Sequence, residues 1–161
     1  MPQWTLFEND FRAIDQVLIE LLEKTNALSA HLVDRSGQLI TTSGRSADFD
    51  VTAFASLVAA DFTANTELSR LLGEESIVAV VNEGKTRSAY SCLLADRVIM
   101  CIVFDRRSTL GLVRHRSHRA AEQLDGVFRT LFEKVGLVES GRDTRDFADA
   151  AGREVDALFG D

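Results

Sequence analysis

The chain has 161 residues, a formal net charge of −7 and a hydrophobic fraction of 45%. This composition predicts one domain with a packed core and excludes a globally disordered chain. A general nucleic-acid-binding protein usually carries the opposite charge balance, so no nucleic-acid partner is expected. The first ten residues lack the regions of a signal peptide, and the longest apolar run, residues 98–104, is too short for a membrane span. We therefore expect a cytoplasmic protein without a membrane partner, whose two cysteines are reduced.

The first predicted element is a helix over residues 5–26, because apolar residues recur at intervals of three and four. These residues are Trp4, Phe7, Phe11, Ile14, Leu18 and Leu21. Two strands are predicted next, over residues 27–34 and 38–44, with Gly37 in the turn between them.

A second helix is predicted over residues 51–72, capped by Asp50 and stopped by Gly73. At 100° per residue, one broad face collects larger apolar side chains and is the expected core face: Val51, Phe54, Leu57, Val58, Phe62, Leu68 and Leu72. A second stripe of mostly small residues lies about a third of a turn away: Ala53, Ser56, Ala60, Ala64, Glu67 and Leu71. The stripe is either an ordinary alanine-rich surface or a contact face for another helix. Asp61 and Asn65 fall near the centre of the expected core face. Either they find hydrogen-bond partners there, or that face is not buried along its whole length.

Three strands are predicted over residues 76–84, 86–95 and 97–104, joined by short turns. The last is apolar throughout residues 98–104, as expected of a central strand covered on both faces. Cys92 and Cys101 flank the last turn and could face each other, although packing as thiols is favoured over a disulfide. A third helix is predicted over residues 110–135, capped by Ser108 or Thr109. This order of elements predicts an α+β sandwich with a five-stranded antiparallel sheet and three helices.

The motifs of common active sites are absent, including the phosphate-binding loop and the nucleophile elbow. His115 and His118 are three residues apart on a predicted helix, but Arg114, Arg116 and Arg119 surround them and disfavour a metal ion. No set of residues combines a nucleophile, a base and an orienting group. We therefore expect no enzymatic activity, no metal and no cofactor.

Two segments carry an unusual charge. Five arginines crowd the start of the third helix, where they form either a solvated surface or a basic patch for an acidic partner: Arg106, Arg107, Arg114, Arg116 and Arg119. Residues 137–161 have a formal side-chain charge of −4 and an apolar spacing compatible with a short amphipathic helix. This acidic tail is either a motif that folds on a partner or a disordered end.

Three segments carry a resemblance to a known family: HLVDRSGQLITTSG (31–44), SLVAADFTANTELSRLLGE (56–74) and VFDRRSTLGLVRHR (103–116). They resemble the bacterial MglB family of Roadblock/dynein light-chain proteins, and the ending EVDALFGD is similar to that of some members. The resemblance implies a Roadblock-type sandwich over residues 1–136, followed by the tail. It also implies a homodimer that binds a small Ras-type GTPase of the MglA kind and raises its GTP hydrolysis by repositioning the GTPase's own catalytic residues.

Carried onto this chain, the resemblance implies three groups of partner-binding residues. The platform for the twin subunit and the GTPase is Ala53, Ser56, Ala60, Thr63, Ala64 and Glu67. Arg119 is a further candidate, and the tail contact is Phe147, Val155, Leu158 and Phe159, in a segment that favours nucleotide exchange in some members. The second helix departs from the family pattern, since Ala60-Asp61 stands where Gly-Asn is frequent, and Thr63 and Glu67 stand where smaller residues are frequent.

The implied process is bacterial cell polarity and gliding motility, with enrichment at a cell pole and other polarity proteins as further candidate partners. An alternative is a non-activating Roadblock scaffold that binds an acidic polarity protein through the arginines at the start of the third helix.

Overall fold

The computed structural model describes residues 3–134 and Gly136, with side chains from Glu8 onward. Its elements are α1 (Gln3–Thr25), β1 (Ser29–Asp34), β2 (Leu39–Gly44), α2 (Val51–Leu71), β3 (Val80–Glu83), β4 (Arg87–Leu94), β5 (Val98–Asp105) and α3 (Leu110–Lys134). The predicted α+β order is confirmed. The largest boundary error is at β3, which begins four residues later than expected, because Ile77 packs beneath α2 and Val78 is exposed before the ladder starts at Val80.

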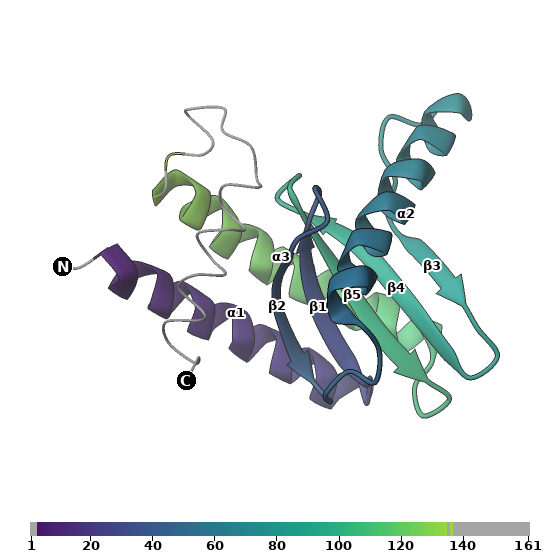
Figure 1. Ribbon diagram of the computed structural model, residues 1–161, viewed down its shortest axis with the longest axis horizontal. Coiled ribbons are helices and arrows are strands. Elements are labelled where there is room, and N and C mark those ends of the chain that lie inside the picture. The colour runs from purple at the N-terminus through teal and green to yellow at the C-terminus, as the bar shows by residue number, and fades with distance from the viewer. Residues whose placement is uncertain (1–2, 135, 137–161) are drawn as a thin grey trace.

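The five strands form one antiparallel sheet in the order β2-β1-β5-β4-β3. Strand β5 lies at its centre, and every residue from Val98 to Phe104 is buried, as its unbroken apolar sequence predicts. Helices α1 and α3 cover one face of the sheet, whereas α2 lies alone on the other face (Figure 1). The two faces are therefore covered unequally.

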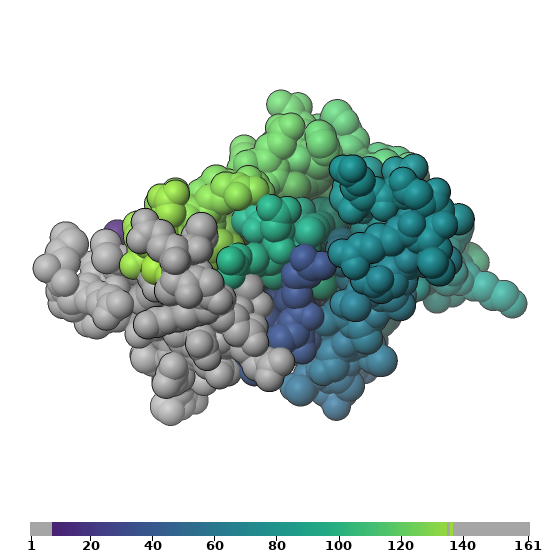
Figure 2. Space-filling view, turned by 90° about the horizontal axis from the view of Figure 1, so that it is seen from above, coloured from purple at the N-terminus to yellow at the C-terminus, as the bar shows by residue number. Residues whose placement is uncertain are grey.

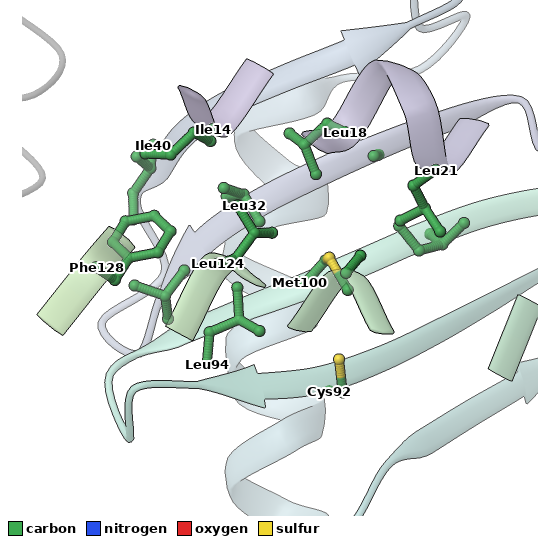
Figure 3. Close-up of a cluster of buried hydrophobic side chains, with 14 of the residues drawn as sticks. Ile14, Leu18, Leu21, Leu32, Ile40, Cys92, Leu94, Met100, Leu124 and Phe128 are labelled. Carbon is green, nitrogen blue, oxygen red and sulfur yellow. The ribbon is translucent and has the colours of Figure 1, made fainter. Parts of the chain in front are cut away.

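The larger core lies between the sheet and the helices α1 and α3 (Figure 3). Helix α1 contributes Ile14 and Leu18, α3 contributes Leu124 and Phe128, and Met100 comes from the central strand. All of these side chains are fully buried. This layer accounts for most of the buried apolar surface, and hence for most of the hydrophobic stabilisation.

The two cysteines lie on opposite faces of the sheet, so the expectation that they could face each other is wrong. Cys92 is paired with Met100 in the ladder and packs in the larger core, whereas Cys101 is paired with Ser91. Successive side chains of a strand point to opposite faces, and this register separates the two sulfurs. Burial raises the pKa of the Cys92 thiol to about 12 and that of the Cys101 thiol to about 11, which keeps both protonated and unreactive.

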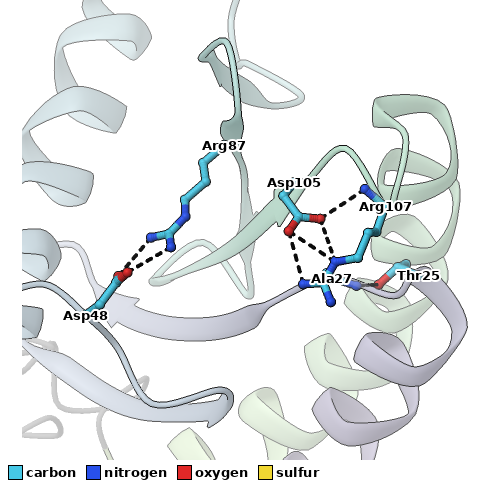
Figure 4. Close-up of polar contacts among 6 residues, drawn as sticks. All are labelled: Thr25, Ala27, Asp48, Arg87, Asp105 and Arg107. Atoms are coloured by element: carbon cyan, nitrogen blue, oxygen red, sulfur yellow. Dashed lines mark hydrogen bonds and ion pairs between the residues drawn. The ribbon is translucent and has the colours of Figure 1, made fainter.

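The loop of residues 45–50, which leads into α2, is fixed by polar contacts in its second half (Figure 4). The Arg87 guanidinium donates two hydrogen bonds of 2.8 Å to the Asp48 carboxylate, which joins the start of β4 to this loop. Asp50 then caps the helix, because its Oδ1 accepts a hydrogen bond of 3.1 Å from the Ala53 amide. Both ends of the ion pair are exposed, so it contributes more to position than to stability.

A buried histidine lies under the first turn of α2. His31 is joined by hydrogen bonds to the hydroxyls of Ser29, at 2.9 Å, and Thr42, at 3.0 Å. The rings of Phe49 and Phe54 cover it, with centroids 6.0 and 5.0 Å away. Burial lowers the pKa of His31 from 6.5 to about 4, so the imidazole is neutral in the folded protein.

His31 makes the stability of the fold depend on pH. Between pH 6.5 and about 4 the unfolded chain binds a proton on this residue that the folded chain does not bind. The free energy of unfolding should therefore fall as the pH is lowered through this window. Denaturant unfolding at about pH 7 and about pH 5 measures the fall, and His31→Gln is the comparison variant, because it cannot titrate there. We expect a smaller fall for the variant, and an equal fall in both proteins would contradict this origin.

Candidate partner interface

Helix α2 contacts its own sheet through small side chains. Its buried residues are Ala55, Ala59 and Phe62, which pack against Val33 and Ile99. Short side chains let the helix approach closely. A Cβ added to Gly37 would lie 3.2 Å from the Cα of Ser56, and Gly37 also has a φ of +100°. The turn between β1 and β2 thus needs glycine for its backbone conformation and for the helix that passes over it.

The expected core face of α2 is therefore wrong in part. Phe62 is buried, but Leu57, Leu68 and Leu72 are 68%, 55% and 75% exposed. The helix carries two apolar faces, and periodicity does not state which of them the sheet covers. The close approach at Gly37 selects the face with alanines and leaves the leucines outside.

The platform residues expected from the resemblance all lie on the exposed side of α2: Ala53, Ser56, Ala60, Thr63, Ala64 and Glu67. Leu57 and Leu68, which were expected in the core, and Leu71, which was not part of the expected platform, extend this surface. We use "outer face of α2" for the residues that share one side of the helix at 100° per residue: Ala53, Leu57, Ala60, Ala64, Leu68 and Leu71. Their spacing of three and four is that of a helix that packs against another helix.

A groove of about 580 Å³ runs beside this face. One wall is formed by α2, including Leu57, Ala60 and Ala64, and the floor and other side are formed by the strands, including Ala89 and Ser91. The groove exists because α2 covers only part of its face of the sheet. Figure 2 shows the surface of α2 (blue to teal) along one side of the molecule, and Figure 1 shows its C-terminal end rising beyond the strands.

Asp61 and Asn65 are satisfied by hydrogen bonds, which answers the question that their position raised. The Asn65 amide donates to the Asp61 backbone oxygen, at 2.8 Å, and to its Oδ1, at 2.9 Å. The Asn82 amide donates to Asp61 Oδ2, at 2.8 Å. Asp61 thereby joins α2 to the edge strand β3 across the groove. Sequence reasoning missed Asn82, since nothing in its neighbourhood marks it as a partner for a residue 21 positions earlier.

The arginines do not form one site with α2. Arg106 donates to the Lys85 carbonyl and Arg107 pairs with Asp105. Arg116 and Arg119 line a cleft between α1 and α3, on the other side of the sheet from the outer face of α2. The structure therefore separates Arg119 from the platform residues. The tail residues Phe147, Val155, Leu158 and Phe159 lie outside the described residues.

The described residues provide neither a metal site nor a membrane span. Among them, no group of three or more His, Cys, Asp or Glu side chains is arranged to hold a metal ion. Within the same part of the chain, no helix has the length and apolar character needed to cross a membrane.

The arrangement of a lone helix on one face of the sheet and two helices on the other places the chain in the Roadblock class. It is shared with the Roadblock/LC7 domain from Streptomyces avermitilis, with a TM-score of 0.65 and 13% identity over 71% of this chain and 97% of that chain. Myxococcus xanthus MglB is 36% identical, with a TM-score of 0.71 over 75% of this chain and 91% of that chain. The gliding protein MglB from Thermus thermophilus is 28% identical, with a TM-score of 0.69 over 73% of this chain and 90% of that chain.

The chain therefore belongs to the MglB family of Roadblock proteins. No family model and no curated protein matches it, so this assignment depends on the solved structures.

The contact between Asp61 and Asn82 can be tested by Asn82→Ala. This change removes the hydrogen bond that joins α2 to β3, and we expect the free energy of unfolding to fall by about 1 kcal/mol. Amide hydrogen exchange should also become faster in the second half of α2. Glu83→Ala, at the next residue of the same edge strand, is the matched control and should leave both values near wild type. Equal effects of the two changes would show that the hydrogen bond does not hold the helix.

Proposed function

We propose that this protein is a homodimeric regulator that accelerates GTP hydrolysis by a small Ras-type GTPase of the MglA kind. The observation that supports the proposal is the outer face of α2, a row of leucines and alanines that the protein's own core leaves exposed. Its membership of the MglB family agrees with this role.

A second copy of the chain is the occupant that we propose for part of this face. Leu57, Leu68 and Leu71 are 68%, 55% and 86% exposed, and burial of a leucine side chain contributes roughly 1.5–3 kcal/mol. Two copies related by a twofold axis would bury the same residues on each other. Ala60 and Ala64 between the leucines allow two helix axes to approach closely. The paired helices would then present a wider platform to the GTPase.

The proposed mechanism is positioning. Hydrolysis of GTP depends on the placement of water and of charged groups around the γ-phosphate rather than on covalent chemistry. A regulator can therefore act by binding preferentially to the GTPase conformation in which the GTPase's own arginine and glutamine reach the nucleotide. Residues 137–161 are proposed as an additional contact that favours nucleotide exchange, through Phe147, Val155, Leu158 and Phe159.

The platform is tested by Ala64→Arg. The purified wild-type protein should show no GTPase activity alone and should raise single-turnover GTP hydrolysis by an MglA-type GTPase at least about tenfold. Ala64→Arg should abolish this stimulation and shift the mass measured by light scattering from dimer to monomer, because a bulky cation replaces a small side chain at the helix contact.

Thr130→Arg is the matched control, since it adds the same residue to an exposed position of α3. It should stimulate hydrolysis and dimerise like wild type. Stimulation by Ala64→Arg at the wild-type level would refute the platform. Binding of the wild-type protein without stimulation would instead favour the adaptor function.

The tail is tested by ending the chain after Gly136. All described helices and strands are retained, so the truncated protein should stay folded and unfold cooperatively in denaturant. It should still stimulate hydrolysis, but it should lose the acceleration of nucleotide exchange, measured by release of a fluorescent nucleotide. Unchanged exchange kinetics together with unchanged affinity would reject a role for the tail.

A further inference from the structure

A second concave surface lies on the helical layer, on the other side of the sheet from the outer face of α2. It is a cleft of about 150 Å³ between α1 and α3. We call it the α1–α3 cleft, and its lining residues are Val17, Glu20, Leu21, Lys24, Arg116, Arg119, Ala120 and Gln123. The lining combines three apolar side chains with four charged ones, a composition suited to an amphipathic segment with acidic residues.

The α1–α3 cleft carries positive charge that the described residues do not neutralise. Lys24 forms an ion pair of 2.7 Å with Glu20, which leaves Arg116 and Arg119. Among the described residues, neither arginine has a carboxylate within ion-pair distance, and the Nε of Arg116 is buried without a hydrogen-bond partner. The charge of Arg116 also helps Lys24 to lower the pKa of Glu20. The three cations Lys24, Arg116 and Arg119 against the one carboxylate of Glu20 give the lining a formal charge of +2, which on a protein of net charge −7 favours an anionic occupant.

The chain itself supplies a segment of matching chemistry. Residues 137–161 have a formal charge of −4, and their acidic residues alternate with apolar ones such as Val155 and Leu158. Carboxylates of this segment could pair with Arg116 and Arg119 while its apolar side chains contact Val17, Leu21 and Ala120. We infer that, in the free protein, the acidic tail of residues 137–161 docks in the α1–α3 cleft of its own chain.

The lengths of the two segments allow this contact. Helix α3 rises about 22 Å from Arg119 to its end at Lys134. The chain from Lys134 to Phe147 spans about 40 Å when extended, so the residues after Phe147 can return along the helix to the cleft. A short connection of this kind gives an effective concentration of about millimolar, which favours the chain's own tail over the tail of another molecule.

Docking would occupy the tail while no partner is bound. A partner that uses the same apolar residues has to release the tail first, so the cleft lowers the apparent affinity of such a partner. The contact combines exposed ion pairs with a small apolar area, and salt should weaken it.

Paramagnetic broadening in the full-length chain tests the inference. Ala150→Cys provides one accessible thiol for a nitroxide label, because Cys92 and Cys101 are both buried. We expect the label to broaden the amide signals of Lys24, Ala120 and Gln123 and to leave those of the outer face of α2 unchanged. The broadening should decrease in about 0.5 M NaCl, where the Debye length is roughly 4 Å.

Variants in the same full-length chain identify the charges. Arg116→Glu combined with Arg119→Glu should abolish the broadening, and adding Asp149→Lys, Glu154→Lys and Asp156→Lys should restore it. Arg114→Glu is the matched control on the same helix outside the cleft, and it should behave like wild type. A spectrum with native dispersion shows that each variant is folded.

Four results would overturn the inference. The first is no broadening in the cleft, and the second is a loss of broadening with Arg114→Glu equal to that with the double variant. The third is broadening that appears only when spin-labelled molecules are mixed with isotope-labelled ones, which would mean that the tail of another copy occupies the cleft. In the fourth, the amide signals of the cleft change when anionic phosphatidylglycerol vesicles are added but are not broadened by the label. This result would make a lipid surface the occupant of the cleft. No GTPase is present in these experiments, so their outcome is independent of the proposed function.

Discussion

The close approach of α2 to the sheet is the constraint on which the exposed leucine row, the proposed partner surface, depends. Gly37 leaves room for the backbone at Ser56, and Ala55 and Ala59 fill the narrow space above Val33 and Ile99. A helix held by alanines at this distance turns its leucines outward. The exposed row of Leu57, Leu68 and Leu71 is therefore a consequence of how the helix packs on its own sheet rather than a separate design.

The two faces of the sheet differ in how much apolar surface they bury. The layer of α1 and α3 buries the larger core, with Leu18, Leu124 and Phe128 fully enclosed, and it stabilises the fold. The α2 layer buries little apolar surface, and one polar link, from Asn82 to Asp61, ties its second half to the edge strand β3. The larger core should therefore keep the protein folded when side chains on the outer face of α2 are changed, so such changes can test the proposed platform separately from the fold.

The periodicity of the sequence was sufficient for the elements but not for the side of α2 that is buried. The apolar run of residues 98–104 predicted the central strand, and Asp50 predicted the start of α2. Two features depend on tertiary structure and could not be read locally. The ladder register places Cys92 opposite Met100 rather than near Cys101, and the choice between two apolar faces of α2 depends on the room that Gly37 leaves. The candidate platform came from resemblance, and periodicity placed Leu71 in the second stripe, but only the structure added Leu57 and Leu68.

The position of Asp61 joins these points. A carboxylate in the expected core face predicts either a hydrogen-bond partner or a site open to solvent, and the structure provides both. Asn65 and Asn82 donate hydrogen bonds to Asp61, and Asp61 lines the open groove beside α2. A partner that enters the groove meets the edge of this hydrogen-bond network as well as the apolar wall of Leu57 and Ala60. Desolvating a charged group is costly unless its hydrogen bonds are kept, so the groove favours partners that leave the bonds of Asp61 intact. Under the proposed function, Asp61 would add partner selectivity through the cost of displacing its bonds, while the leucines would provide the apolar contact area.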